Sequence, residues 1–424
     1  MKPSLKTFLS VFSGLTMLTS CETQIENPAL APATAEMLDF TKYIAVGSSM
    51  VAGYTNGGLY RDGQLASYPN LIAQQTGAKF EQALFPMGQE NGTGYLVTSA
   101  GNTSAQFDKI IEKTGIISTS PLLLTKYSGK SNNFGVATLR MSDMGKAGLG
   151  NVKMQGFNPY FERILPTGKE DITYPDFVKE SNPTFFTVSI GEYDMLAFAT
   201  SGGKSSLTET SVFALNCQKL LDALVANKAK GIITNLPNVI DFPYFNFYSF
   251  EDLAKNIGVS GIYITTGNGI VRLATTNDRI LLDAIPNVGK NNASGQKKGT
   301  STMYPLTNEE VLDKDEVNSV ASRLTDFNGI LKLEAEKRGI ASVDLNSIYK
   351  QIQNNNYNAG NGIKLSNSLL TGNFFSLDGI NPTPRGSAVI ANEIIKSINE
   401  NYKNFLKTVI PTLDVSKFEA LKIK

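Results

Sequence analysis

The chain has 424 residues, of which 41% are hydrophobic and 18% charged, so it can bury the core of one large globular domain or two smaller ones. Its 39 basic residues balance its 38 acidic residues, which argues against a nucleic-acid partner. It contains no histidine and only two cysteines, which excludes an imidazole base and argues against a zinc or copper site; we predict no metal and no cofactor.

The first 20 residues are predicted to be a lipoprotein signal peptide. Lys2 and Lys6 make the start of the chain basic. The apolar run at 8–18 that follows is too short to span a bilayer. The sequence Leu-Thr-Ser-Cys at 18–21 then resembles a bacterial lipobox. We expect cleavage before Cys21 and lipidation of Cys21, which would anchor the mature protein to the outer membrane. The alternative is an ordinary signal peptide with a chance cysteine, and the face of the membrane is left open.

The remaining chain is predicted to be a short tether followed by one domain. Residues 21–40 contain two prolines and many small residues, which is typical of a flexible linker. The domain is expected to cover residues 41–424. Two segments rich in glycine, asparagine and serine, at about 80–175 and 242–312, are predicted to be long insertions into it.

Short apolar strands alternate with helices along this domain. Strands are predicted at 42–47, 184–190, 231–236 and 339–344. Helices are predicted to begin near Ser67, to cover 211–224 and 317–331, and to begin at Pro384. Cys217 lies among leucines in the second of these helices and is expected to be a packed core thiol. The alternation predicts an α/β domain with a parallel sheet covered on both faces.

Polar residues follow several of the predicted strands. Ser49 follows the first strand, residues 192–194 follow the second and Asn235 follows the third. Ligands of parallel sheets bind beyond the carboxyl ends of the strands. The sequence therefore predicts that these residues share one cleft.

Four sequence blocks occur in a characteristic order. They are Ala-Val-Gly-Ser-Ser-Met-Val-Ala-Gly at 45–53, Asn-Asn-Phe-Gly-Val at 132–136, Ile-Gly-Glu-Tyr-Asp-Met-Leu at 190–196, and residues 376–392. Together they resemble the SGNH or GDSL-like hydrolases, in particular the lipid-anchored members found in Bacteroidota. The resemblance extends from about residue 40 to 402 and implies a three-layer α/β/α, flavodoxin-like fold.

The resemblance also implies a set of site residues. In the family, a serine attacks an ester, a histidine held by an aspartate activates the serine, and a glycine amide and an asparagine side chain stabilise the oxyanion. By this resemblance Ser49 takes the nucleophile position and Asp378 the acid position. Asn381 replaces the histidine, Thr138 replaces the oxyanion glycine and Tyr193 replaces the oxyanion asparagine. The tyrosine hydroxyl is expected to lie too far from its backbone to substitute simply.

Three functions are consistent with these substitutions. The leading hypothesis is a catalytically inactive lipoprotein that acts as a binding or assembly subunit, with an outer-membrane β-barrel or another lipoprotein as its partner. The second is an active esterase that uses Ser49 with a carboxylate base, for which Glu192, Asp194 and Asp378 are candidates. The third is a protein that binds a lipid or carbohydrate in the former active-site cleft.

An aromatic run at 242–250 is the remaining unusual feature. Core packing beneath the second insertion is the favoured interpretation. The alternative is an exposed patch, in which Phe245, Phe247 and Tyr248 would anchor a partner.

Overall fold

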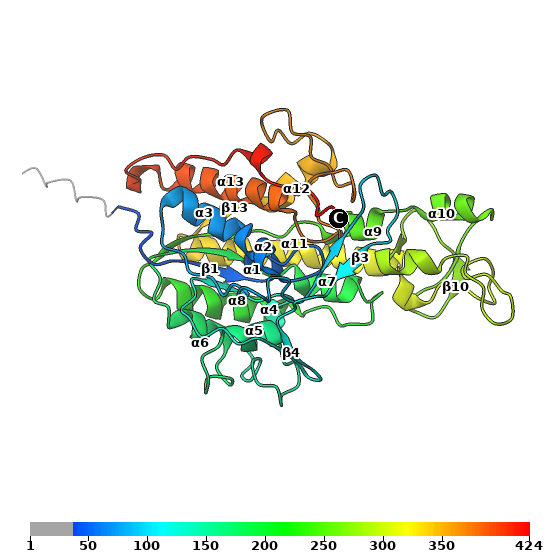
Figure 1. Ribbon diagram of the computed structural model, residues 1–424, viewed down its shortest axis with the longest axis horizontal. Coiled ribbons are helices and arrows are strands. Elements are labelled where there is room, and N and C mark those ends of the chain that lie inside the picture. The colour runs from blue at the N-terminus through cyan, green and yellow to red at the C-terminus, as the bar shows by residue number, and fades with distance from the viewer. Residues whose placement is uncertain (1–36) are drawn as a thin grey trace, which may run out of the picture. The chain divides into compact units, whose positions relative to one another are not determined.

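A five-stranded parallel sheet forms the centre of the structure, a computed structural model that describes residues 37–424 (Figure 1). The predicted signal peptide, Cys21 and most of the predicted tether lie outside the described residues. In spatial order the strands are β13 (Ala341–Val343), β8 (Lys230–Thr234), β7 (Phe185–Ser189), β1 (Tyr43–Gly47) and β6 (Asn133–Gly135). This is the flavodoxin-like order, in which the direction of chain progression reverses between β1 and β7.

The two central strands, β1 and β7, are buried on both faces because helices cover the sheet on both sides. Every residue of β1 and β7 is buried, and the strands pair in register from Tyr43 with Phe185 to Gly47 with Ser189. Strands buried on both faces read as continuous apolar runs, which is why the sequence predicted them. The predicted three-layer α/β/α fold is confirmed.

Two groups of helices flank the sheet (Figure 1). In one group α3 packs against α13, and in the other α8 packs against α11. The first group comprises α1 (Ser49–Ala52), α2 (Arg61–Leu65), α3 (Tyr68–Thr76), α12 (Leu345–Gln353) and α13 (Pro384–Asn401). The second comprises α4 (Met141–Met144), α5 (Pro159–Ile164), α6 (Tyr174–Lys179), α7 (Tyr193–Ala199), α8 (Thr210–Val225) and α11 (Lys314–Lys337).

Local signals in the sequence set where the longer helices begin. Asp313 caps α11 in a capping box with Glu316, and Thr383 caps α13 directly before Pro384. Cys217 on α8 is buried in the core, as predicted.

The first predicted insertion is not a continuous one. It contains β6, an edge strand of the central sheet, and α4, which packs against α8. A three-residue strand with a polar first residue produces no apolar run, so periodicity did not reveal it. The segment also carries two hairpins, formed by β2 (Tyr95–Val97) with β3 (Asp108–Ile110) and by β4 (Ile116–Thr119) with β5 (Leu122–Leu124).

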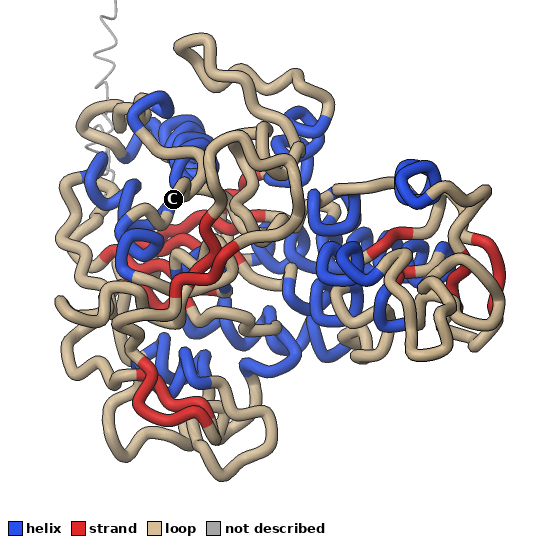
Figure 2. The backbone as a smooth tube through the Cα atoms, turned by 45° about the vertical axis from the view of Figure 1, so that its right-hand side comes forward, coloured by secondary structure: helices blue, strands red, loops and turns tan. Residues whose placement is uncertain are grey.

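The second predicted insertion contributes a lobe, defined here as residues 247–312, which extends beyond one end of the sheet where α10 and β10 are labelled in Figure 1. Figure 2 shows its short strands surrounded by loops. The segment 242–312 contains α9 (Pro243–Asn246), α10 (Phe250–Ile257), β9 (Tyr263–Thr265), β10 (Val271–Leu273), β11 (Arg279–Ile280) and β12 (Val311–Leu312). β9 pairs with β10, and β11 pairs with β12.

The aromatic run at 242–250 is mostly core. Phe242, Tyr244, Phe245 and Phe250 are buried, whereas the side chains of Phe247 and Tyr248 are partly exposed. The exposed-patch alternative is therefore wrong for Phe245, because α9 turns this side chain into the core. Within residues 37–424, no helix is long and apolar enough to cross a membrane.

Candidate active site

Ser49 lies in the turn that joins β1 to α1. The strand ends at Gly47, whose φ is +147°, and a Cβ atom there would lie 1.9 Å from the Ser189 carbonyl oxygen. Only glycine fits this close approach of β1 to β7. Ser49 is the first residue of α1 and has no exposed surface. The serine thus lies beside the reversal point of the sheet, where ligands of this fold class bind.

Thr138 places its backbone amide against this serine. Its N–H donates a hydrogen bond to the Ser49 Oγ at 2.9 Å. Its φ is +61°, in the left-handed region that favours glycine, while its side chain is exposed to solvent. The amide is therefore present at the position that the resemblance assigns to an oxyanion donor.

Both carboxylate oxygens of Asp378 accept hydrogen bonds. Its Oδ1 accepts hydrogen bonds from the backbone amides of Ile380 and Asn381 and from the Ser376 hydroxyl, at 2.8–3.0 Å. Its Oδ2 accepts from the Gly57 amide at 2.9 Å and from the Asn381 Nδ2 at 3.0 Å. Asn381 is buried, and its carboxamide holds the aspartate as an imidazole N–H would, but it cannot take up a proton.

Tyr193 lies close to the side chains of Ser49 and Asn381. It is the first residue of α7, directly after the turn that follows β7. Burial raises the pKa of Tyr193, and hydrogen bonding with the Ser49 and Asn381 side chains lowers it only in part. The hydroxyl therefore lies near the serine side chain. With a pKa above its ordinary value, it is protonated at neutral pH and cannot act as a base.

Asp378, its partner Asn381, Tyr193 and Ser49 thus lie close together at the reversal point of a doubly wound sheet. A family model described as GDSL-like Lipase/Acylhydrolase matches residues 43–394. The chain belongs to this family. A search of curated proteins finds no match to it.

The two remaining candidate carboxylates of this GDSL-family chain differ in their surroundings. Burial alone raises the pKa of Glu192 to about 7, and within residues 37–424 no hydrogen bond joins its carboxylate to Ser49. Asp194 accepts hydrogen bonds from the amides of Met141 and Ser142 and from the Thr208 hydroxyl, so it caps α4. Burial raises its pKa to about 6 despite these donors. Asp194 thus has a structural role.

Asn235 does not join the site, contrary to the expectation of one shared cleft. Its Nδ2 donates to Asp344 at 2.7 Å, and its Oδ1 accepts from the Asn346 amide at 3.0 Å. Both partners follow β13, which is the neighbour of β8 on the side away from β7. The side chain therefore ties two strand ends together.

Two tyrosines beside the site were missed. Tyr54 directly follows the first sequence block, and its ring meets the Tyr160 ring edge-on at 6.2 Å. Burial raises the pKa of Tyr54, and the nearby Tyr160, Tyr193 and Asp378 raise it further, which places Tyr54 beside the site. The position of Tyr54 next to the serine block was an available signal. Tyr160 lies in the first predicted insertion, where nothing in the sequence singled it out.

Proposed function

We propose that this GDSL-family protein has lost ester hydrolysis and acts as a lipid-anchored subunit that binds or assembles an outer-membrane protein complex. The observation that carries the first part is the state of Ser49. Its hydroxyl is buried and bonded to the Thr138 amide, and its side-chain neighbour is a protonated tyrosine. A nucleophile needs an open approach for the ester and a group that accepts its proton, and this serine has neither.

The missing base is the larger deficit. Removing the base from a serine-hydrolase triad lowers kcat by roughly 10⁶, which corresponds to about 8 kcal/mol of transition-state stabilisation. Asn381 has no proton-accepting nitrogen, and Asp378 already accepts hydrogen bonds at both oxygens. The retained acid therefore has no base to orient.

A second candidate function is ester hydrolysis with Glu192 as the base. The observation that favours it is the pKa of about 7, which suits a general base at neutral pH. The absence of a hydrogen bond between this carboxylate and Ser49 in residues 37–424 argues against it. Binding of a ligand in the former cleft has less support, because Ser49 has no exposed surface.

The lobe supports the second part of the proposal, a partner-binding role. Its exposed large apolar side chains are Ile270 (60%), Val271 (38%), Leu273 (46%) and Met303 (76%). β10 is an edge strand of a two-stranded sheet, and within the described residues it pairs only with β9. An outer strand with exposed apolar side chains is a typical protein-binding surface. An outer-membrane β-barrel or another lipoprotein is the partner that a lipid on Cys21 would bring within reach.

An esterase assay tests the loss of catalysis. The purified chain, Ser49→Ala and Glu192→Gln are compared on p-nitrophenyl esters of short and medium acyl chains. We expect the same negligible rate from all three. A rate that disappears in Ser49→Ala overturns the proposal, and its loss in Glu192→Gln as well identifies the glutamate as the base.

Gentle detergent extraction of the tagged protein tests the assembly role. Cys21→Ala is expected to release the protein from the membrane fraction. The double variant Val271→Asp/Leu273→Asp is expected to lose the co-purifying partner. Val409→Asp is the matched control, because Val409 is an equally apolar, 75% exposed residue outside the lobe. All variants must keep the wild-type thermal transition.

Two results would refute the assembly role. One is a monomer with no partner in mild detergent. The other is equal loss of the partner in the lobe variant and in the Val409 control, which would show a non-specific effect of added charge.

A further inference from the structure

The domain has two different ends, set by the direction of its central strands. All five strands are parallel and therefore begin at the same end, and the helices that connect them run back to that end. The described chain also starts there, because the Leu38 amide donates to the Phe405 carbonyl oxygen at 2.7 Å, just after α13. Ser49 lies at the opposite end, after β1. Figure 1 shows the start of the described chain in blue on the left, and α10 and β10 of the lobe on the right.

The end where the strands begin carries exposed lysines, and we call it the basic end, defined here as Lys42, Lys228, Lys230, Lys403 and Lys407. All five are exposed, and within residues 37–424 none of them forms an ion pair. Within five positions of these lysines in the sequence, only Asp39 and Glu400 are acidic. Neighbouring charges neutralise each other in the ion pairs Lys79–Glu81 and Arg338–Asp222. The basic end therefore has a surplus of positive charge.

These lysines belong to one continuous surface. Thr184 joins the starts of three strands, because its amide donates to the Lys42 carbonyl oxygen at 3.2 Å and its own carbonyl oxygen accepts from the Lys230 amide at 3.1 Å. The Lys230 Nζ lies 5.6 Å from the centroid of the Phe405 ring. Phe405 in turn lies between the last two lysines of the basic end in the sequence.

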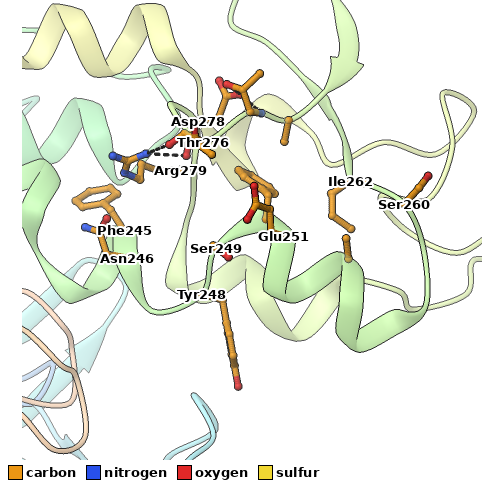
Figure 3. Close-up of a pocket in the computed structure, with 15 residues that line it drawn as sticks. Phe245, Asn246, Tyr248, Ser249, Glu251, Ser260, Ile262, Thr276, Asp278 and Arg279 are labelled. Atoms are coloured by element: carbon orange, nitrogen blue, oxygen red, sulfur yellow. Dashed lines mark hydrogen bonds between the residues drawn. The ribbon is translucent and has the colours of Figure 1, made fainter.

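The lobe has no such surplus. Its residues 247–312 include six basic and six acidic side chains. In the lobe's cavity of about 420 Å³, which Figure 3 shows, Asp278 accepts two hydrogen bonds of 2.7 Å from Arg272, and Arg279 donates to the backbone carbonyls of Thr276 and Asp278. The charge asymmetry of the domain thus runs from the basic end to a lobe whose charges balance.

The covalent chain places the basic end nearest to the predicted lipid. Cys21 precedes Met37, the first described residue, by 16 positions, and 16 residues span at most about 55 Å when fully extended. Residues 38–41 and Lys407 line one groove of about 550 Å³, so the chain enters the domain beside a lysine of the basic end. Exposed lysines next to a membrane anchor are attracted to anionic lipid headgroups.

We propose that the basic end docks on a membrane surface that contains anionic phospholipid, so that the Ser49 site and the lobe point away from the membrane. This inference rests on the proposed lipid anchor, which brings the domain to the membrane. Each lysine close to an anionic surface strengthens the association about fivefold, and salt screens this attraction. The lysines therefore orient an anchored domain and do not hold it on the membrane without the lipid.

Vesicle flotation tests the surface without the lipid. The chain from residue 21 onward, with Cys21→Ala, is mixed at about 50 mM sodium chloride with vesicles of phosphatidylcholine alone or with about a third phosphatidylglycerol. We expect binding to the anionic vesicles only, and release at about 500 mM salt. Lys403→Glu/Lys407→Glu is expected to weaken binding by at least about tenfold. Lys290→Glu/Lys297→Glu, with two exposed lysines of the lobe, is the matched control and is expected to bind as the unmodified chain does.

Several results would overturn the proposal. They are equal binding to both kinds of vesicle, full affinity in Lys403→Glu/Lys407→Glu, and equal weakening in the lobe control, which would show an effect of net charge alone. Binding to poly-L-glutamate without binding to anionic vesicles would instead identify a surface for an acidic protein. All variants must keep the wild-type thermal transition. Because the tested chain carries no lipid, failure here leaves the anchor unaffected, and the membrane fractionation of Cys21→Ala tests the anchor separately.

An environment-sensitive fluorophore tests the orientation by a second route that leaves every lysine in place. It is attached to Thr408→Cys beside the basic end or to Ser294→Cys in the lobe, both at exposed positions, while the native Cys217 is buried. We expect the emission of the label at 408 to shift to the blue on anionic vesicles and that of the label at 294 to stay unchanged. A shift at 294 that equals or exceeds the shift at 408 would overturn the orientation.

Discussion

Replacing Glu192 with glutamine should stabilise the protein at alkaline pH and not at acidic pH. Glu192 is 8% exposed, and burial alone raises the pKa of its carboxyl from 4.5 to about 7. At about 1.4 kcal/mol for each pH unit, this rise corresponds to about 3 kcal/mol. The folded-state pKa lies above the unfolded-state value, so the folded state binds the proton more tightly. The corresponding stability is fully present below about pH 4.5 and is lost as the pH rises through about 7.

Glutamine has the shape of the protonated glutamate and stays neutral at every pH. Glu192→Gln should therefore match the wild type near pH 4.5 and exceed its free energy of unfolding by up to about 3 kcal/mol above pH 7. Urea denaturation of both proteins at several pH values between these limits measures the difference directly. Comparing the two proteins cancels the contribution of Asp194, whose pKa is also raised.

Asp194→Asn is the contrasting control. The Asp194 carboxylate accepts two backbone amides and the Thr208 hydroxyl, so an amide side chain loses acceptor capacity at every pH. Asp194→Asn should therefore be less stable than the wild type throughout. A difference between Glu192→Gln and the wild type that does not change with pH would refute the reasoning, since it would show that Glu192 titrates near its ordinary pKa in the fold.

Three further predictions concern the site and the core. Asn381→His alone should not create an efficient esterase in the p-nitrophenyl ester assay, because Tyr193 still stands beside Ser49 in place of the oxyanion asparagine. Only the triple variant with Thr138→Gly and Tyr193→Asn should approach a rapid rate, and efficient hydrolysis by the single variant would contradict this. Thr138→Gly alone should raise the free energy of unfolding by up to about 1 kcal/mol, because φ is +61°, and a loss of stability on urea denaturation would contradict it. Phe245→Ser should cost at least about 3 kcal/mol whereas Phe247→Ser should cost less, which thermal denaturation of the pair checks, because only Phe245 is fully buried.

The sequence was sufficient to predict the parts of the fold that depend on local pattern. β1 and β7 are short runs of mostly apolar residues, which is typical of buried parallel strands. Pro384 marked the start of α13 because the preference for proline in the first turn of a helix is local. The order of the four sequence blocks then located Ser49 and Asp378 within this framework.

The parts that failed depend on where side chains reach in space. Tyr193 lies beside Ser49 because the two residues follow the neighbouring strands β7 and β1, and no local pattern encodes how far its side chain extends. Asn235 also follows a strand, yet it bonds to residues after β13. Each of these outcomes depends on partners that lie far away in the sequence, and local patterns do not show such partners.

The retention of Asp378 has a structural explanation that needs no catalysis. Its carboxylate accepts hydrogen bonds from Gly57, in the loop between α1 and α2, and from Asn381, in the loop before α13. It therefore joins two segments that are more than 300 residues apart. Removing a partly buried carboxylate that satisfies several backbone amides would leave those donors unpaired, at a cost of about 1–3 kcal/mol for each that stays buried. Asn381 preserves the one contact of a histidine that this loop requires, which is the donor to Asp378, and dispenses with the nitrogen that only proton transfer requires. If ester hydrolysis is lost as proposed, the three replacements keep the hydrogen bonds of the scaffold without the base, which is the pattern expected when selection acts on the fold and its surface.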